Sequence, residues 1–180
     1  PPILQFGGRP AFIMRAVLAA TLSSVYGIYS GYELCENEAI PGKEEYLDSE
    51  KYEIKVRDWN VPGNIVDVIT RINAIRRECP ALQTYNNVLF LATDNPNILA
   101  YAKMTEDRSD IVICVVNLDP FHKHWSMMHI PLDTFGIGHD EQYQAHDLLS
   151  DERYRWSGHS VYVELAPPNK IAHIIKVRRW

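Results

Sequence analysis

The sequence has little cysteine, no long apolar run and only a small excess of negative charge. Its three cysteines, among 180 residues, are widely spaced and form no Cys-x-x-Cys pair. We therefore expect three reduced, mostly buried thiols, and neither a disulfide framework nor a zinc site. No run of about 18 apolar residues occurs, which excludes a transmembrane helix. The net charge of −5 argues against binding to nucleic acid or to an anionic membrane.

Several common catalytic motifs are also absent. The chain has no nucleophile elbow, P-loop, Rossmann glycine fingerprint or HExxH helix. His122 and His124 could lie on one face of a strand as metal ligands, but solvent-facing positions at a turn are the simpler interpretation because no third ligand is evident. The pairs His139-Asp140 and His146-Asp147 have no serine in a nucleophile context. The sequence thus predicts no metal and no cofactor.

The composition is that of a folded chain. It is 46% hydrophobic and 23% charged, which is ordinary for a globular protein able to bury a core. The chain opens with Pro1-Pro2, without an initiator Met or a signal-peptide pattern. We therefore expect it to be a piece of a longer polypeptide.

The first 80 residues predict two helices and one strand. Gly7-Gly8-Arg9-Pro10 breaks the chain before an apolar helix over residues 11–22, which should be largely buried. Residues 25–29 are typical of a short buried strand. Asn64 can cap a second amphipathic helix that Pro80 stops.

A long polar segment over residues 33–60 separates these elements. Between Glu33 and Glu53 it has eight acids and two lysines, with a turn at Pro41-Gly42. Such a long connection is usually functional or disordered. Its acids could include a glycosidase-type acid–base pair, although a solvated acidic loop is the simpler interpretation.

Beyond Pro80 the spacing of apolar residues changes from that of helices to that of extended strands. Strands are expected over residues 88–92, 98–102, 111–117, 125–130, 143–147, 160–165 and 171–177. This pattern indicates an antiparallel β-sandwich over residues 80–180. Residues 1–79 are typical of the last β/α unit of a (β/α)8 TIM barrel. The expected fold class is therefore an α+β fragment, a barrel end followed by a sandwich.

Lys51 and Tyr52 stand out within the polar segment. They follow the proposed barrel strand, in a loop of the kind that builds the active-site face of a barrel. A lysine ammonium can neutralise a phosphate or bind a sugar hydroxyl, and a tyrosine can stack or donate a hydrogen bond. The alternative is a surface lysine beside a tyrosine that anchors the loop.

Several segments of the chain occur together in one known family. They are Gly7–Phe12, Arg15–Ser23, Tyr26–Glu36, Pro41–Tyr52 and Arg57–Trp59, with looser matches at Val115–Pro120, Asp147–Leu149 and Tyr154–Trp156. In this combination the chain resembles the α-1,4-glucan:maltose-1-phosphate maltosyltransferases, bacterial members of the α-amylase superfamily. The match is dense over residues 1–80.

The resemblance implies a retaining transfer of maltosyl from α-maltose 1-phosphate to the non-reducing end of an α-1,4-glucan acceptor, with release of phosphate. Retention requires two closely placed carboxyl groups and a covalent glycosyl-enzyme. The family's catalytic carboxylates match no acid of this chain, and the counterpart of Glu33 is not catalytic. The resemblance therefore gives this chain no catalytic residue, and it implies that Lys51 and Tyr52 bind the sugar phosphate. It also implies a cytoplasmic enzyme that forms a homodimer.

Two other functions remain open. The sandwich could be a non-catalytic carbohydrate-binding module that stacks sugars on Trp125, Trp156 or Trp180, although packing of these side chains between the sheets is the favoured interpretation. The chain could also be part of another α-amylase-type glycoside hydrolase or transglycosylase.

Overall fold

The computed structural model of the chain describes residues 2–47 and 54–180. The described residues form the helices α1 (Pro2–Leu22), α2 (Val66–Glu78) and α3 (Leu132–Phe135), and the 3₁₀ turns η1 (Tyr32–Leu34) and η2 (Pro80–Gln83). The strands are β1 (Val88–Leu91), β2 (Ile98–Met104), β3 (Ile111–Asn117), β4 (His124–His129), β5 (Gln142–Asp147), β6 (Arg153–Ser157), β7 (Ser160–Leu165) and β8 (Ala172–Arg178). None of the helices in this part of the chain is long and apolar enough to cross a membrane.

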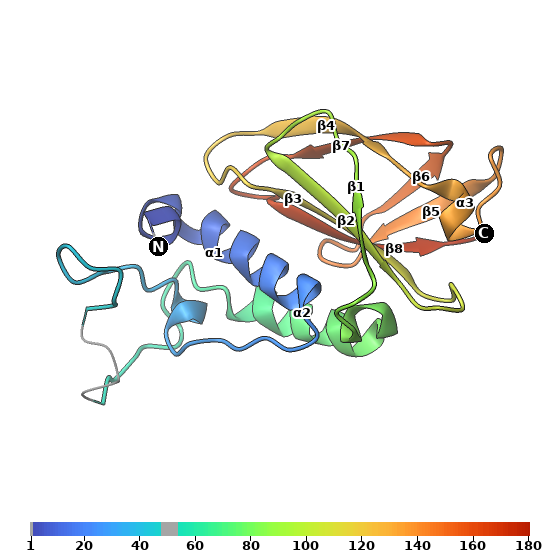
Figure 1. Cartoon of the computed structure of the whole chain (residues 1–180). Coiled ribbons are helices and arrows are strands. Elements are labelled where there is room, and N and C mark those ends of the chain that lie inside the picture. The colour runs from blue at the N-terminus through green and yellow to red at the C-terminus, as the bar shows by residue number, and fades with distance from the viewer. Residues whose placement is uncertain (1, 48–53) are drawn as a thin grey trace.

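The strands form two antiparallel sheets. The larger sheet has the order β1-β2-β3-β8-β5-β6, and β4 pairs with β7 in a separate two-stranded sheet. In Figure 1, β4 and β7 lie on one side of the larger sheet, while α1 and α2 lie on the other. The expected antiparallel sandwich is confirmed, with a layer of helices against its second face.

Strand β3 explains how this arrangement is held together. All seven of its residues are buried, although strand side chains alternate between the two faces of a sheet. Ile113 and Val115 belong to the core between the two sheets, whereas Val112, Cys114 and Val116 belong to the core shared with α1 and α2. Each fully buried aliphatic side chain contributes about 1.5–3 kcal/mol to the free energy of unfolding. The helices therefore share one apolar core with the larger sheet, and the two sheets share a second core on the other face of β3.

Helix α1 contains the break that its glycines predict. Gly8 adopts φ 59° and ψ −156°, and Pro10 lies in the first turn of the segment that follows. The helical turn before Gly8 was not predicted. At Gly7 a Cβ atom would lie 3.0 Å from Pro120 Cγ, so this glycine lets the loop after β3 approach α1 closely.

The expected strand over residues 25–29 is not formed in the described part of the chain. These residues have no strand partner among the described residues, and Val25 is 79% exposed. Apolar composition favours a strand, but the strand needs a neighbour to bond its backbone N–H and C=O groups. The structure therefore contains the sandwich and two helices without a complete β/α unit in its described part.

The other elements agree with the sequence, apart from small differences. The second helix begins close to its expected cap, where Asn64 Oδ1 accepts a hydrogen bond from the Val66 N–H at 3.1 Å. Strand β6 was not among the expected strands. Its exposed Arg153 and Arg155 alternate with Tyr154 and the buried Trp156, which weakens the apolar signal.

Candidate functional site

Lys51 and Tyr52, the two predicted binding residues, lie outside the described residues. The structure does describe the chain on both sides of them, up to Leu47 and again from Ile54. Residues 31–47 and 54–65 flank Lys51 and Tyr52 along the chain, and we call these two segments the frame of the candidate site.

Glu36 connects the two sides of the frame. Its Oε1 lies 2.9 Å from Arg57 Nε, and its Oε2 lies 3.4 Å from both Arg57 Nη2 and Lys55 Nζ. The Arg57 side chain is only 5% exposed, so the two-pronged pair is shielded from water and stronger than a surface ion pair. The pair brings the chain before Lys51 and the chain after Tyr52 to one place.

Gly31 makes room for this pair. It adopts φ 92° just before η1, and a Cβ atom there would lie 2.2 Å from Glu36 Oε2 and 3.1 Å from Arg57 Nε. The position therefore requires glycine for its backbone conformation and for the close approach of the ion pair.

The turn predicted at Pro41-Gly42 is confirmed. The Lys43 N–H donates to the Ile40 carbonyl at 2.9 Å, and Gly42 has φ 77°. Beyond this turn the chain doubles back, and Tyr46 stacks on Tyr29 with ring centroids 5.7 Å apart. This hairpin-like segment, over residues 39–46, lies shortly before Lys51 in the sequence.

A small cavity of about 170 Å³ opens beside the frame. It is lined by Glu36, Asn37, Glu38, Tyr46, Leu47 and Lys55. Carboxylate, amide, phenol and ammonium groups suit a ligand rich in hydroxyl groups. Because complete small-molecule sites occupy roughly 300–1,000 Å³, this cavity is too small to be a complete site by itself.

Glu33 also belongs to this segment. Its backbone carbonyl accepts the Ile65 N–H at 2.8 Å, which attaches η1 to the start of α2. Its Oε2 atom is buried and has no hydrogen-bond partner among the described residues. A buried polar atom costs free energy unless it is paired, so Glu33 has unused hydrogen-bonding capacity.

Of the histidines considered as metal ligands, His122 lies in the bend before β4 and His124 is the first residue of β4. His122 Nδ1 and His124 Nε2 lie 2.9 and 3.0 Å from the same atom, Asp119 Oδ2. Burial raises the pKa of Asp119, but hydrogen bonds from His124, the Phe121 N–H and His122 outweigh it and hold the pKa well below its usual range. The described residues contain no group of three potential ligands placed to hold a metal ion.

The two His-Asp pairs of the sequence do not interact as pairs. His146 Nε2 lies 2.5 Å from Asp151 Oδ1, and His139 Nδ1 lies 2.8 Å from His159 Nε2. The first contact joins the buried His146 of β5 to the turn that follows this strand, and the second joins two residues outside the strands.

Asp147 instead contacts a histidine and a serine from other positions. Its Oδ2 lies 2.7 Å from His173 Nδ1 and accepts the Ser150 hydroxyl at 2.8 Å. A Ser-His-Asp triad requires the serine to face the histidine, whereas here the carboxylate lies between them. The arrangement holds the turn after β5 against β8 and lacks an activated nucleophile.

The three tryptophans considered for sugar stacking differ in their surroundings. Trp156 is only 9% exposed and packs edge-on against Tyr143, as packing between the sheets predicts. The same expectation is wrong for Trp125, which is 55% exposed, and for Trp180, whose ring lies 5.3 Å from the Arg155 guanidinium.

Comparison with solved structures identifies the class of fold. The chain is similar over its whole length to part of a maltogenic α-amylase from Thermotoga neapolitana, with a TM-score of 0.67 and 14% identity, covering 39% of that chain. It is also similar over 95% of its length to 34% of an α-amylase from Geobacillus thermoleovorans solved with acarbose, with a TM-score of 0.63 and 16% identity. The architecture is thus one that occurs within α-amylases.

Comparison with curated sequences finds similar proteins over nearly the whole chain. Residues 90–177 match the family model described as "GLGE, C-terminal". The chain is 50% identical over 174 residues to the α-1,4-glucan:maltose-1-phosphate maltosyltransferase of Rhodospirillum rubrum and 48% identical over 172 residues to that of Myxococcus xanthus. The match to the family model is thus confined to residues 90–177, whereas the similarity to a segment of these maltosyltransferases extends over 97% and 96% of the chain. The chain spans about a quarter of their length. The resemblance found in the sequence is confirmed.

Proposed function

We propose that this chain is part of a retaining maltosyltransferase that moves maltosyl from α-maltose 1-phosphate to the non-reducing end of an α-1,4-glucan and releases phosphate. The observation that carries the proposal is the identity of 50% and 48%, over 97% and 96% of the chain, to proteins named for this transfer. We assign the catalytic carboxylates of the double displacement to regions of the longer protein beyond these residues.

We further propose that residues 1–79 are the end of the catalytic (β/α)8 barrel and that residues 80–180 are the C-terminal sandwich. The similarity to α-amylases over the whole chain supports this division. Residues 25–29 would gain the strand partner that they lack here from the rest of the barrel. The exposed Val25 is the kind of side chain that such pairing would bury.

Lys51 and Tyr52 are proposed to bind the donor. The Glu36–Arg57 pair brings together the chain on either side of them, and the cavity beside this pair offers further polar groups. A lysine ammonium matches the negative charge of the sugar phosphate, and the tyrosine can stack on a sugar or donate a hydrogen bond to it. The transfer by double displacement then requires protein carboxylates but no cofactor.

The same proposal places the protein in the bacterial cytoplasm, as a homodimer that elongates a glycogen-like glucan. The chemistry requires a supply of α-maltose 1-phosphate and a glucan with free non-reducing ends.

The test is phosphate release by the longer protein that contains this sequence, supplied with α-maltose 1-phosphate and glycogen. We expect turnover, and we expect Lys51→Ala to raise KM for the sugar phosphate by tenfold or more, since it removes a charge-assisted hydrogen bond worth about 1.5–3 kcal/mol. Lys43→Ala, in the exposed Pro41-Gly42 turn, is the matched control and should leave KM unchanged.

Two outcomes would favour the other functions. Hydrolysis or transfer on plain starch, without phosphate release from the sugar phosphate, would indicate another α-amylase-type enzyme. Glucan binding without any turnover by the longer protein would indicate a carbohydrate-binding module. An unchanged KM in Lys51→Ala would remove only the role given to Lys51.

A further inference from the structure

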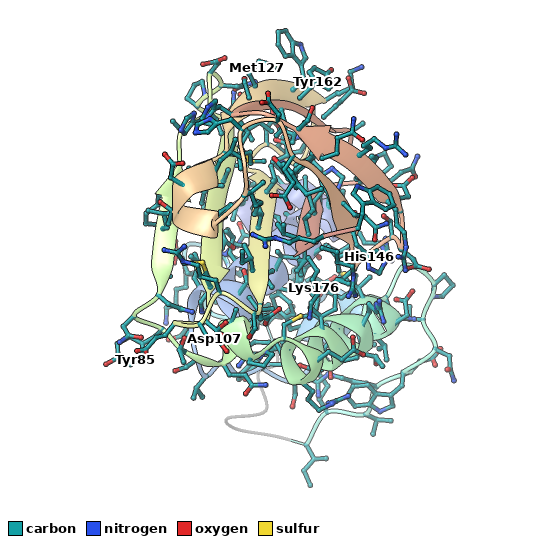
Figure 2. All side chains as sticks on the ribbon, turned by 90° about the vertical axis from the view of Figure 1, so that its right-hand side faces the viewer. Tyr85, Asp107, Met127, His146, Tyr162 and Lys176 are labelled. Carbon is teal, nitrogen blue, oxygen red and sulfur yellow. The ribbon has the colours of Figure 1, made fainter. Side chains whose placement is uncertain are left out.

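The two-stranded sheet has an outer face that no other layer covers in the described part of the chain. The alternation of β4 and β7 points Trp125, Met127, Tyr162 and Glu164 outward, while their neighbours face the core. We call these four residues the β4–β7 outer face. Figure 2 shows Met127 and Tyr162 at the end of the molecule away from α1 and α2, in agreement with the placement of β4 and β7 in Figure 1.

Two aromatic rings dominate this face. The rings of Trp125 and Tyr162 are 28° from parallel, with centroids 5.9 Å apart, and the two residues are 55% and 52% exposed. Large aromatic side chains are costly to leave in water, and exposed ones that lie together mark binding surfaces. The negative face of an aromatic ring attracts the weakly positive C–H groups on the flat side of a pyranose. A pair of such rings therefore offers a stacking surface for sugars.

Hydrogen-bonding groups flank the rings. The Tyr162 hydroxyl donates to Glu164 Oε2 at 2.7 Å, and Lys123 Nζ lies 3.3 Å from the same oxygen. The hydrogen bonds from Tyr162 and Lys123 lower the pKa of Glu164, so its carboxylate stays ionised and can accept sugar hydroxyl groups. Polar groups that are fixed beside an apolar surface set the orientation of a bound ligand.

The charge pattern selects the kind of ligand. Lys123 and Glu164 carry opposite charges within one ion pair, so the edge of the face is neutral. A polyanion would meet the Glu164 carboxylate, and a protein partner that covered this edge would have to remove both charges from water. A neutral, polyhydroxylated chain is not repelled by the Glu164 carboxylate, and it can replace the water around both charges with its own hydroxyl groups.

We propose that the β4–β7 outer face binds a neutral α-glucan chain, with Trp125 and Tyr162 as the stacking residues and Glu164 as a hydrogen-bond acceptor. The choice of α-glucan among neutral polysaccharides rests on the proposed function. The site lies on the sandwich itself, so it would hold a glucan polymer independently of the binding residues proposed in the segment between α1 and α2.

The test is native gel electrophoresis of the protein through gels with and without glycogen, together with maltoheptaose titration of the tryptophan fluorescence. We expect glycogen to retard the protein. Trp125→Ala should weaken glycogen binding on the order of tenfold, the loss typical of removing one aromatic anchor. Tyr162→Ala should weaken binding as well. Trp180→Ala, which removes an exposed tryptophan outside this face, is the matched control and should bind as the unaltered protein does.

The outcomes separate this proposal from the transferase assignment. No retardation of the unaltered protein, or equal retardation of Trp125→Ala and Trp180→Ala with unchanged circular dichroism, would overturn the glucan site. Retardation that depends on Trp125 in a protein without phosphate release would retain the site and remove the transferase. Phosphate release with no dependence of retardation on Trp125 would do the reverse.

Discussion

Single residues decide the geometry of the candidate site, and Gly31 has the clearest effect. Its positive φ and missing side chain let Glu36 and Arg57 meet in the space that a Cβ atom would occupy. The two partners are 21 positions apart, and the contact depends on backbone angles that composition does not reveal. This is why the ion pair could not be predicted from the sequence, although the neighbouring Pro41-Gly42 turn could.

Replacing Gly31 with alanine should therefore be more harmful than the same change at Gly63. Both glycines have positive φ, so each substitution costs about 1–2 kcal/mol of backbone strain. At Gly31 the new methyl group also displaces Glu36 from Arg57, which adds about 2 kcal/mol for the loss of a charged hydrogen bond. At Gly63 no atom lies within 4 Å of the added Cβ. Urea denaturation measures both losses, and equal losses would show that the ion pair does not depend on this glycine.

At the scale of elements, Arg76 joins the two main helices. It lies in the last turn of α2, and its guanidinium donates to the carbonyls of Ala20, Ser23 at 3.0 Å and Ser24 at 2.6 Å, at the end of α1. Carbonyls in the last turn of a helix have no partner within the helix, and a cation there also interacts favourably with the negative end of the helix dipole. The same guanidinium lies over the Tyr26 ring at 5.0 Å.

Arg76→Ala should lower the free energy of unfolding by about 2 kcal/mol, because it leaves several carbonyls without a charged donor. The matched control is Arg77→Ala at the next position, which is exposed and should change stability by no more than about 0.5 kcal/mol. Thermal unfolding followed by far-ultraviolet circular dichroism compares the two. A loss of similar size in both variants would contradict the role given to Arg76.

The elements also show why the sequence predicts some strands well and fails at others. Residues 111–116 are apolar throughout, because β3 is buried on both faces, and the strand predicted over residues 111–117 has the same bounds as β3. Residues 25–29 carry the same signal but do not form a strand, since pairing depends on a neighbour that the local sequence does not contain. Strand β6 gives the opposite error, because its exposed arginines mask the single buried Trp156.

At the scale of the whole molecule, exposed apolar residues gather on the segments that run along the side of α1 and α2 away from the sandwich (Figure 1). Ile54 and Val56 are 97% and 93% exposed, and Val25 and Tyr29 are exposed as well. Helix α1 itself is buried against the sandwich, as the apolar composition of residues 11–22 predicts. On this side of the molecule, the exposed apolar side chains therefore belong to the connecting segments and not to α1.

The isolated 180-residue chain is expected to self-associate through this surface, because exposed apolar patches drive association. The double variant Ile54→Ser and Val56→Ser should shift the apparent mass toward that of a monomer in size-exclusion chromatography with light scattering. Tyr85→Ser, at an exposed aromatic in the connection between η2 and β1, is the control and should leave association unchanged. A chain that stays monomeric at every concentration would refute the prediction.

The core shared by the helices and the larger sheet has a consequence for how this part of the protein can be inherited or exchanged. Helices α1 and α2 pack against the face of the larger sheet that carries Val112, Cys114 and Val116. Gly7 of α1 also lies close to Pro120, in the loop after β3. A gene recombination that joined this sandwich to the helices of an unrelated relative would have to match both surfaces at once. We therefore expect the sandwich and its two helices to be inherited and exchanged between genes as one unit.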